Sequence, residues 1–227
     1  MRHFGAKMNL SSFRTMARPS ITADPDSLLD TFNLYRKQLS VAAIVIVAVG
    51  GGAFLWQANS HRKEAQAEKA FFDAMALSSQ RDPKAADELS KVATRYSGTA
   101  GGVQAALLYA QNRFDAGKFE DGQKALDAVS SPGPFAAGVE AMKAAGYEGQ
   151  EKFDKAAEHY QAASNKATLQ GEKDTYMADA ARALAAGGKK AEAAKIWAEL
   201  AAKVDSPMAS EAKVRLGETS ATAAAKN

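Results

Sequence analysis

Hydrophobic and polar positions recur in the second half of the chain at an interval close to that of one helical hairpin. The segments GKFEDGQKALDAV, EKFDKAAEHYQAA and GKKAEAAKIWAEL begin at Gly117, Glu151 and Gly188. The first two starts are 34 residues apart, and the third follows after 37. Within each segment the apolar residues recur at helical spacing after a short polar turn. The pattern therefore predicts a series of helix–turn–helix units.

Small and bulky residues occupy matching positions in these three units. Small residues precede the turns at Ala110, Ala144 and Ala181, and follow them at Gly122, Ala156 and Ala193. Bulky residues come four positions later, at Leu126, Tyr160 and Trp197. Small residues facing large ones at fixed offsets allow neighbouring helices to interlock. Together with the 34-residue interval, which is that of tetratricopeptide units, this predicts a stack of helical hairpins.

A weaker unit precedes these three, and a single helix follows them. Phe71 and Ala74 belong to the first helix of the weaker unit, and Asp82-Pro83 starts its second helix. Ser206-Pro207 opens a last amphipathic helix, which would cap the stack. We expect about four hairpins, in a domain that covers residues 61–217 and ends in a flexible tail at residues 218–227.

An uncharged segment ahead of the repeats has the length of a membrane span. Its apolar part runs from Leu39 to Trp56, close to the roughly 20 residues that a helix needs to cross a bilayer. Lys37 and Arg62 flank the segment, and Tyr35 and Trp56 fit the positions of interfacial aromatic residues. A cleaved signal peptide is the main alternative, but a 37-residue leader is long. The predicted fold is thus all-α, with one transmembrane helix at residues 38–60 followed by an α-solenoid.

Glycines inside the predicted span favour close packing against another helix. The candidate packing residues are Ala48, Gly50, Gly51 and Gly52. Small residues let two membrane helices approach each other closely. Glycine is also simply common in membrane helices, so both interpretations stay open.

Residues 1–37 form a basic tail with a short amphipathic helix at its end. The tail has six Lys or Arg residues and three Asp residues. The helix carries apolar residues on one face, at Leu28, Leu29, Phe32 and Tyr35, which predicts that it lies in the membrane interface or docks on a membrane partner. Organellar transit peptides have a similar basic composition, but the amphipathic helix favours a bacterial tail. Because basic residues stay on the cytoplasmic side, the tail should be cytoplasmic and the repeat domain periplasmic.

Composition argues against several classes of function. The chain has no cysteine, so it has neither disulfides nor thiol chemistry, and outside the basic tail its charges are balanced, which gives no nucleic-acid surface. His3, His61 and His159 are far apart in sequence and have no neighbours at ligand spacing. Gly187-Gly188-Lys189-Lys190 lacks the first glycine and the Ser or Thr of a phosphate loop. We therefore expect no enzyme activity, catalytic residue, metal, cofactor or small-molecule substrate.

The order of these segments resembles a known family. The short basic tail, the single span that ends in glycines and Trp56, the AEKAFFDA helix and the degenerate repeats are similar to the YfgM-like tetratricopeptide family of bacterial inner-membrane proteins. The resemblance covers residues 34–163. It implies an ancillary subunit of the Sec translocon that cooperates with periplasmic chaperones. This chain departs from the family pattern by an extra hairpin at residues 174–200.

The predicted function is therefore a membrane-anchored scaffold for protein–protein interactions. Stacked hairpins form a concave surface that binds peptides or helices. By register, its inner wall would carry Gln111, Phe114, Glu148 and Arg182. The expected partners are an integral membrane protein complex in the inner membrane, periplasmic proteins and the lipid bilayer. The alternative is a structural accessory subunit of a large energy-transducing complex, either a photosynthetic reaction centre or a respiratory complex.

Overall fold

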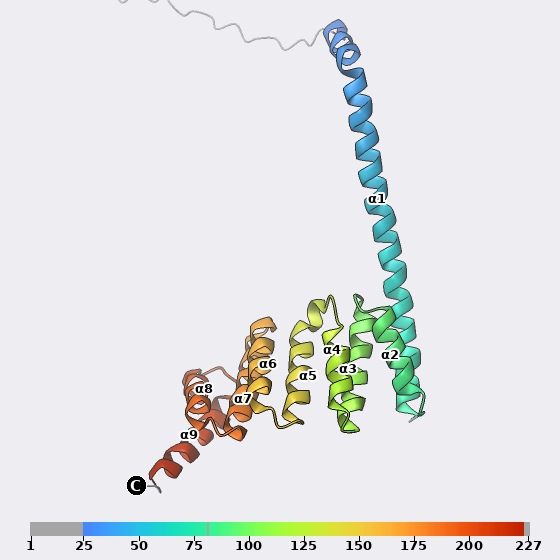
Figure 1. Cartoon of the computed structure of the whole chain (residues 1–227). Helices are drawn as coiled ribbons and strands as arrows, with labels where there is room; N and C mark the ends of the chain where they lie inside the picture. Colours follow the sequence, from blue (N-terminus) through green and yellow to red (C-terminus); the bar gives the residue numbers. More distant parts are fainter. Residues whose placement is uncertain (1–24, 81, 225–227) are drawn as a thin grey trace, which may run out of the picture. The chain divides into compact units, whose positions relative to one another are not determined.

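The computed structural model describes residues 25–80 and 82–224 of the chain, and side chains at residues 49, 53–80 and 82–218. Over these residues the protein is entirely helical, as predicted, with no strand (Figure 1). The helices are α1 (Pro25–Ser79), α2 (Ala85–Arg95), α3 (Ala100–Asp115), α4 (Phe119–Asp127), the short 3-10 helix η1 (Gly133–Phe135), α5 (Ala136–Glu148), α6 (Phe153–Lys166), α7 (Gln170–Ala186), α8 (Lys190–Ala202) and α9 (Ala209–Ala224).

The chain divides into two compact units, residues 1–56 and residues 57–227. The described part of the first unit is the amino-terminal part of α1. Side chains at the predicted interfacial face (Leu28, Leu29, Phe32 and Tyr35) and at the predicted packing residues (Ala48, Gly50, Gly51 and Gly52) lie outside the described residues, and both predictions stay untested.

No helix in the described part of the chain combines the length and apolar character needed to cross a membrane. Most side chains of the predicted span, residues 38–60, lie outside that part. The transmembrane helix therefore stays a prediction.

The second unit is a row of helical hairpins. The last turns of α1 pair with α2, and the pairs α3–α4, α5–α6 and α7–α8 follow, with α9 at the end (Figure 1). These are the four predicted hairpins and the predicted last helix. Helix α9 continues to Ala224, and the flexibility of residues 218–227 stays a prediction.

Two apolar cores stabilise the row. The first joins α1, α2 and α3 around Phe71, Leu89 and Ala106, of which Leu89 is fully buried. The second joins α5 to α9 around Trp197 and Leu200, which pack among many alanines. The predicted small residues Ala110, Ala144, Ala156, Ala181 and Ala193 are all buried, and so are the predicted bulky residues Leu126, Tyr160 and Trp197. The pattern of small and large residues therefore identified the packed faces correctly.

Candidate partner-binding surface

Three turns of the same geometry join the two helices of the last three hairpins. Their central residues, Gly117, Glu151 and Gly188, have φ angles of 73°, 58° and 84°. In each turn the next residue, a lysine, donates its backbone N–H to the carbonyl of the residue five positions earlier, at distances of 2.7, 2.9 and 2.8 Å. This is the Schellman arrangement, which ends a helix with one residue in the left-handed conformation. The equivalence of the three turns confirms the repeats that the sequence predicts.

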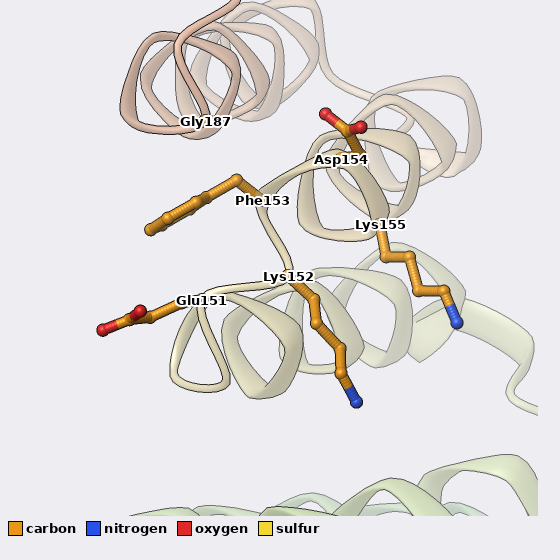
Figure 2. Close-up of a pocket in the computed structure, with 6 residues that line it drawn as sticks. All are labelled: Glu151, Lys152, Phe153, Asp154, Lys155 and Gly187. Carbon is orange, nitrogen blue, oxygen red and sulfur yellow. The ribbon is translucent and has the colours of Figure 1, made fainter.

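Each of the first two turns borders a shallow depression. One has a volume of about 360 Å³ and is lined by Glu151, Lys152, Phe153, Asp154, Lys155 and Gly187 (Figure 2). The other, of about 500 Å³, is lined by the residues 34 positions earlier, Gly117 to Asp121, together with Gln150. In Figure 2 the ring of Phe153 lies next to Gly187, and both lysines point away from it. The two depressions are therefore equivalent features of neighbouring repeats.

A phenylalanine at the start of one helix packs against a glycine at the end of a later one. Phe119 opens α4 and contacts Gly149, and Phe153 opens α6 and contacts Gly187. Lys189 adds an ion pair to Asp154, with 2.9 Å between Nζ and Oδ1. Phe119, Phe153 and Lys189 thus join successive hairpins.

The predicted partner residues on α3 have different surroundings. Gln111 is exposed, and its amide donates a hydrogen bond of 2.7 Å to Asp115. Phe114 is half-buried, and its ring stacks on Phe119 with 5.8 Å between centroids. The same ring fills the space beside Gly122 and Gly146. Gln111 is therefore open to a partner, whereas Phe114 joins α3 to α4 and α5.

Glu148 and Arg182 each take part in polar contacts between helices. Tyr160 Oη on α6 donates a hydrogen bond of 2.9 Å to Glu148 at the end of α5. On α7, Arg182 forms ion pairs with Asp179 and with Glu211 of α9. Its guanidinium also lies over the ring of Trp197, 5.9 Å from the centroid. Glu148 also acts electrostatically on Asp179, the partner of Arg182, so these two predicted residues lie in one region.

The electrostatics of this region follow from burial and from Arg182. Burial raises the pKa of Asp179, and Arg182 offsets only part of this effect. The hydrogen bond from Arg182 lowers the pKa of Glu211, and the same contact raises the pKa of Arg182. Burial and the nearby Glu148 raise the pKa of Tyr160. All these groups have partners within the chain. Through the ion pair between Arg182 and Glu211, the region holds α9 against α7.

Two ionic contacts were not predicted from the sequence: one is partly buried, and the other is made by a buried carboxylate. Glu140 on α5 accepts hydrogen bonds from His159, at 2.8 Å, and from Lys166 on α6. Asp174 on α7 is almost completely buried and accepts a hydrogen bond of 2.6 Å from Lys203. The partners are 19 to 29 residues apart in sequence, so no local motif marks them.

The described residues include no group of three or more His, Asp or Glu residues placed to hold a metal ion. What this surface offers instead is exposed side chains on a regular row of helices. Such a surface is suited to binding other proteins.

Comparison with known proteins agrees with the helical hairpins. Residues 31–134 match the family described as "Tetratricopeptide repeat-like domain". No curated protein and no solved structure matches the chain. The matched family is the repeat-like domain in general, and the match does not confirm the narrower YfgM-like resemblance. The similarity to tetratricopeptide repeat-like domains is thus shown for residues 31–134, a little under half of the chain.

Proposed function

We propose that the protein is a non-enzymatic scaffold, anchored in a membrane, that binds other proteins through its row of helical hairpins. One observation carries this proposal: equivalent hairpins with equivalent turns follow one another, in a chain that matches a tetratricopeptide repeat-like domain. Repeats of this kind present an extended surface on which a peptide or helix of a partner can lie.

Exposed apolar side chains support the membrane anchor. Phe54, Leu55 and Trp56 are 70%, 69% and 75% exposed, and Val49 is 67% exposed. Single exposed apolar residues are normal on soluble proteins, but a contiguous group needs a cover. In the proposal that cover is lipid, because these residues belong to the uncharged segment that precedes Arg62.

The proposed location is the bacterial inner membrane, with residues 1–37 in the cytoplasm and the repeat domain in the periplasm. The charge difference across the segment supports this orientation. Protease added to intact spheroplasts should digest the repeat domain and spare an epitope at the amino terminus. A repeat domain that resists the protease until the membrane is permeabilised would show the opposite orientation.

The proposed partner is an integral membrane protein complex, with periplasmic proteins as further candidates. The YfgM-like resemblance supports an ancillary role at the Sec translocon. Among the four predicted contact residues, Gln111 is the exposed one, so it is the best position for detecting a partner.

A photo-crosslinking amino acid in place of Gln111 tests the proposal in native membranes. Lys124 is the matched control, because it is exposed on α4, the second helix of the same hairpin. We expect one reproducible crosslinked protein from position 111 and none from position 124. The absence of any product from position 111, or identical products from both positions, would contradict a partner site on the first helices of the hairpins.

A further inference from the structure

The connections between helices lie at two opposite edges of the second unit, residues 57–227. The turn edge contains the connections within the last three hairpins: residues 116–118, 149–152 and 187–189. The loop edge contains the connections between hairpins: residues 96–99, 128–135, 167–169 and 203–208. Along the loop edge Gly98 lies beside Ser130, and Gly171 lies beside Pro207, so loops distant in sequence are neighbours in space.

The two edges differ in polarity. Every connection of the turn edge contains at least one charged residue. At the loop edge, residues 96–99, 128–135 and 167–169 contain none, and residues 203–208 contain Lys203 and Asp205. Between residues 82 and 208, two large apolar side chains are exposed: Leu169 at 64% and Val204 at 94%. Both lie on the loop edge.

Within the second unit, the first residues of α1 lie at the loop edge. Glu64 accepts a hydrogen bond of 3.1 Å from the backbone N–H of Ala100, and Ala67 packs against Gly101 at the start of α3. At the far end of the same two helices, Asn112 donates a hydrogen bond of 3.4 Å to Ser78. Helices α1 and α3 therefore run parallel, and residues 57–63 precede Glu64 in α1. At 1.5 Å per residue, these residues extend about 10 Å past the loop edge.

We propose that the loop edge contacts the surface of the lipid bilayer, with Leu169 and Val204 reaching into the interface. This inference rests on the proposed membrane anchor. The headgroup layer on each side of a bilayer is about 5 to 8 Å thick, comparable to the length of helix that precedes the loop edge. Uncharged loops lose little hydration at such a surface, and exposed apolar side chains gain from entering it.

The absence of cysteine makes a direct test possible, because a single introduced thiol carries the label. The probe positions are Leu169→Cys and Val204→Cys. The controls are Lys118→Cys and Lys190→Cys, which are exposed at the turn edge and at the start of α8 beside it. The full chain is labelled with an environment-sensitive fluorophore and reconstituted in vesicles of phosphatidylethanolamine and phosphatidylglycerol. Lipids with spin-labelled headgroups then quench those fluorophores that touch the bilayer.

We expect quenching at positions 169 and 204 to exceed that at positions 118 and 190 several-fold. Equal quenching at all four positions, or none at 169 and 204, would overturn the proposal. A blue shift of the labels at 169 and 204 in native membranes, without quenching in vesicles, would also overturn it, because a protein would then cover this edge. Carbonate extraction of the same vesicles tests the anchor separately. Release of the chain by carbonate rejects the anchor, whereas retention without quenching rejects only the contact of the loop edge.

Discussion

Phe119 and Gly149 fit together because Gly149 has no side chain. Gly149 ends α5 with ordinary helical angles, φ −62° and ψ −21°, which any residue can adopt. A methyl group at this position would collide with the ring of Phe119. Glycine is therefore needed here for space and not for backbone freedom.

Gly149→Ala should lower the free energy of unfolding by about 1–3 kcal/mol, the usual cost of overpacking. Denaturation of the full chain in detergent, followed by circular dichroism, measures the change. Gly138→Ala is the matched control, because Gly138 lies in the same helix and a methyl group there would meet no neighbouring atom. That variant should gain roughly 0.5–1 kcal/mol from the higher helix propensity of alanine. Equal effects of the two changes would rule out the ring contact as the cause.

Glu151→Gly should stabilise the protein. Glu151 is the one residue other than glycine with a positive φ among the described residues, and it holds the place that glycine holds in the two equivalent turns. The left-handed conformation costs a residue with a side chain roughly 1–2 kcal/mol, and part of this is regained in the variant. We expect a net gain of about 1 kcal/mol in chemical denaturation.

The reverse change in a matching turn is the control for this prediction. Gly117→Ala introduces the same strain where a methyl group would touch nothing, so it should destabilise by about 1 kcal/mol. If Glu151→Gly instead weakens the protein, the Glu151 side chain makes a stabilising contact that outweighs its backbone strain.

Phe114→Ala should cost about 2–4 kcal/mol, because the ring packs beside Gly122 and Gly146 and neither glycine can fill the space left. Phe72→Ala is the control, since Phe72 is half exposed on α1 and should cost less than about 1 kcal/mol. Thermal unfolding of both variants measures the difference. A similar cost for the two would contradict the role of Phe114 in joining α3 to α4 and α5.

Asp174→Asn should weaken the protein by about 1–3 kcal/mol at neutral pH, because the buried carboxylate accepts charged and neutral hydrogen bonds. Burial raises the pKa of Asp174, but the hydrogen bonds from Lys203, Ser206 and Gln170 outweigh burial and lower it below 3.8. A lowered pKa contributes stability above the ordinary pKa, and this is lost as the pH falls through the folded value. The deficit of the variant should therefore shrink at acidic pH.

Asp179→Asn is the control for this pH dependence, because the pKa of Asp179 is shifted in the opposite direction to that of Asp174. The pKa of Asp179 lies above 3.8, so the parent protein gains stability at this site as the pH falls. Relative to the parent, this variant should become less stable on acidification, while Asp174→Asn recovers. Unfolding curves at several pH values distinguish the two, and slopes of the same sign would contradict the assignment.

Much of the fold was predictable from local spacing. The interval from Gly117 to Glu151 and the alternation of small and bulky residues depend on contacts that every hairpin repeats, so they are visible in a single sequence. The three equivalent turns confirm this part, and residues 31–134 match a tetratricopeptide repeat-like domain.

The roles of individual surface residues were less predictable. Register placed Phe114 and Arg182 on an inner wall, yet register does not tell whether a neighbouring helix already uses a side chain. Phe114 is used by packing against two glycines, and Arg182 by a carboxylate on α9. The contact of Glu140 with His159 similarly depends on how α5 packs against α6, and no short sequence motif encodes this packing.

The separation of the two apolar cores has a consequence for biosynthesis. Among the residues that the structure describes, the first core is complete once residue 129 has been made, and the second begins at Ala141. A chain that emerges from the ribosome or a translocation channel with its amino terminus first can therefore bury its first core before the second half has been delivered. Folding can follow the order of synthesis, and the hairpins already formed can serve as a template for those that come later.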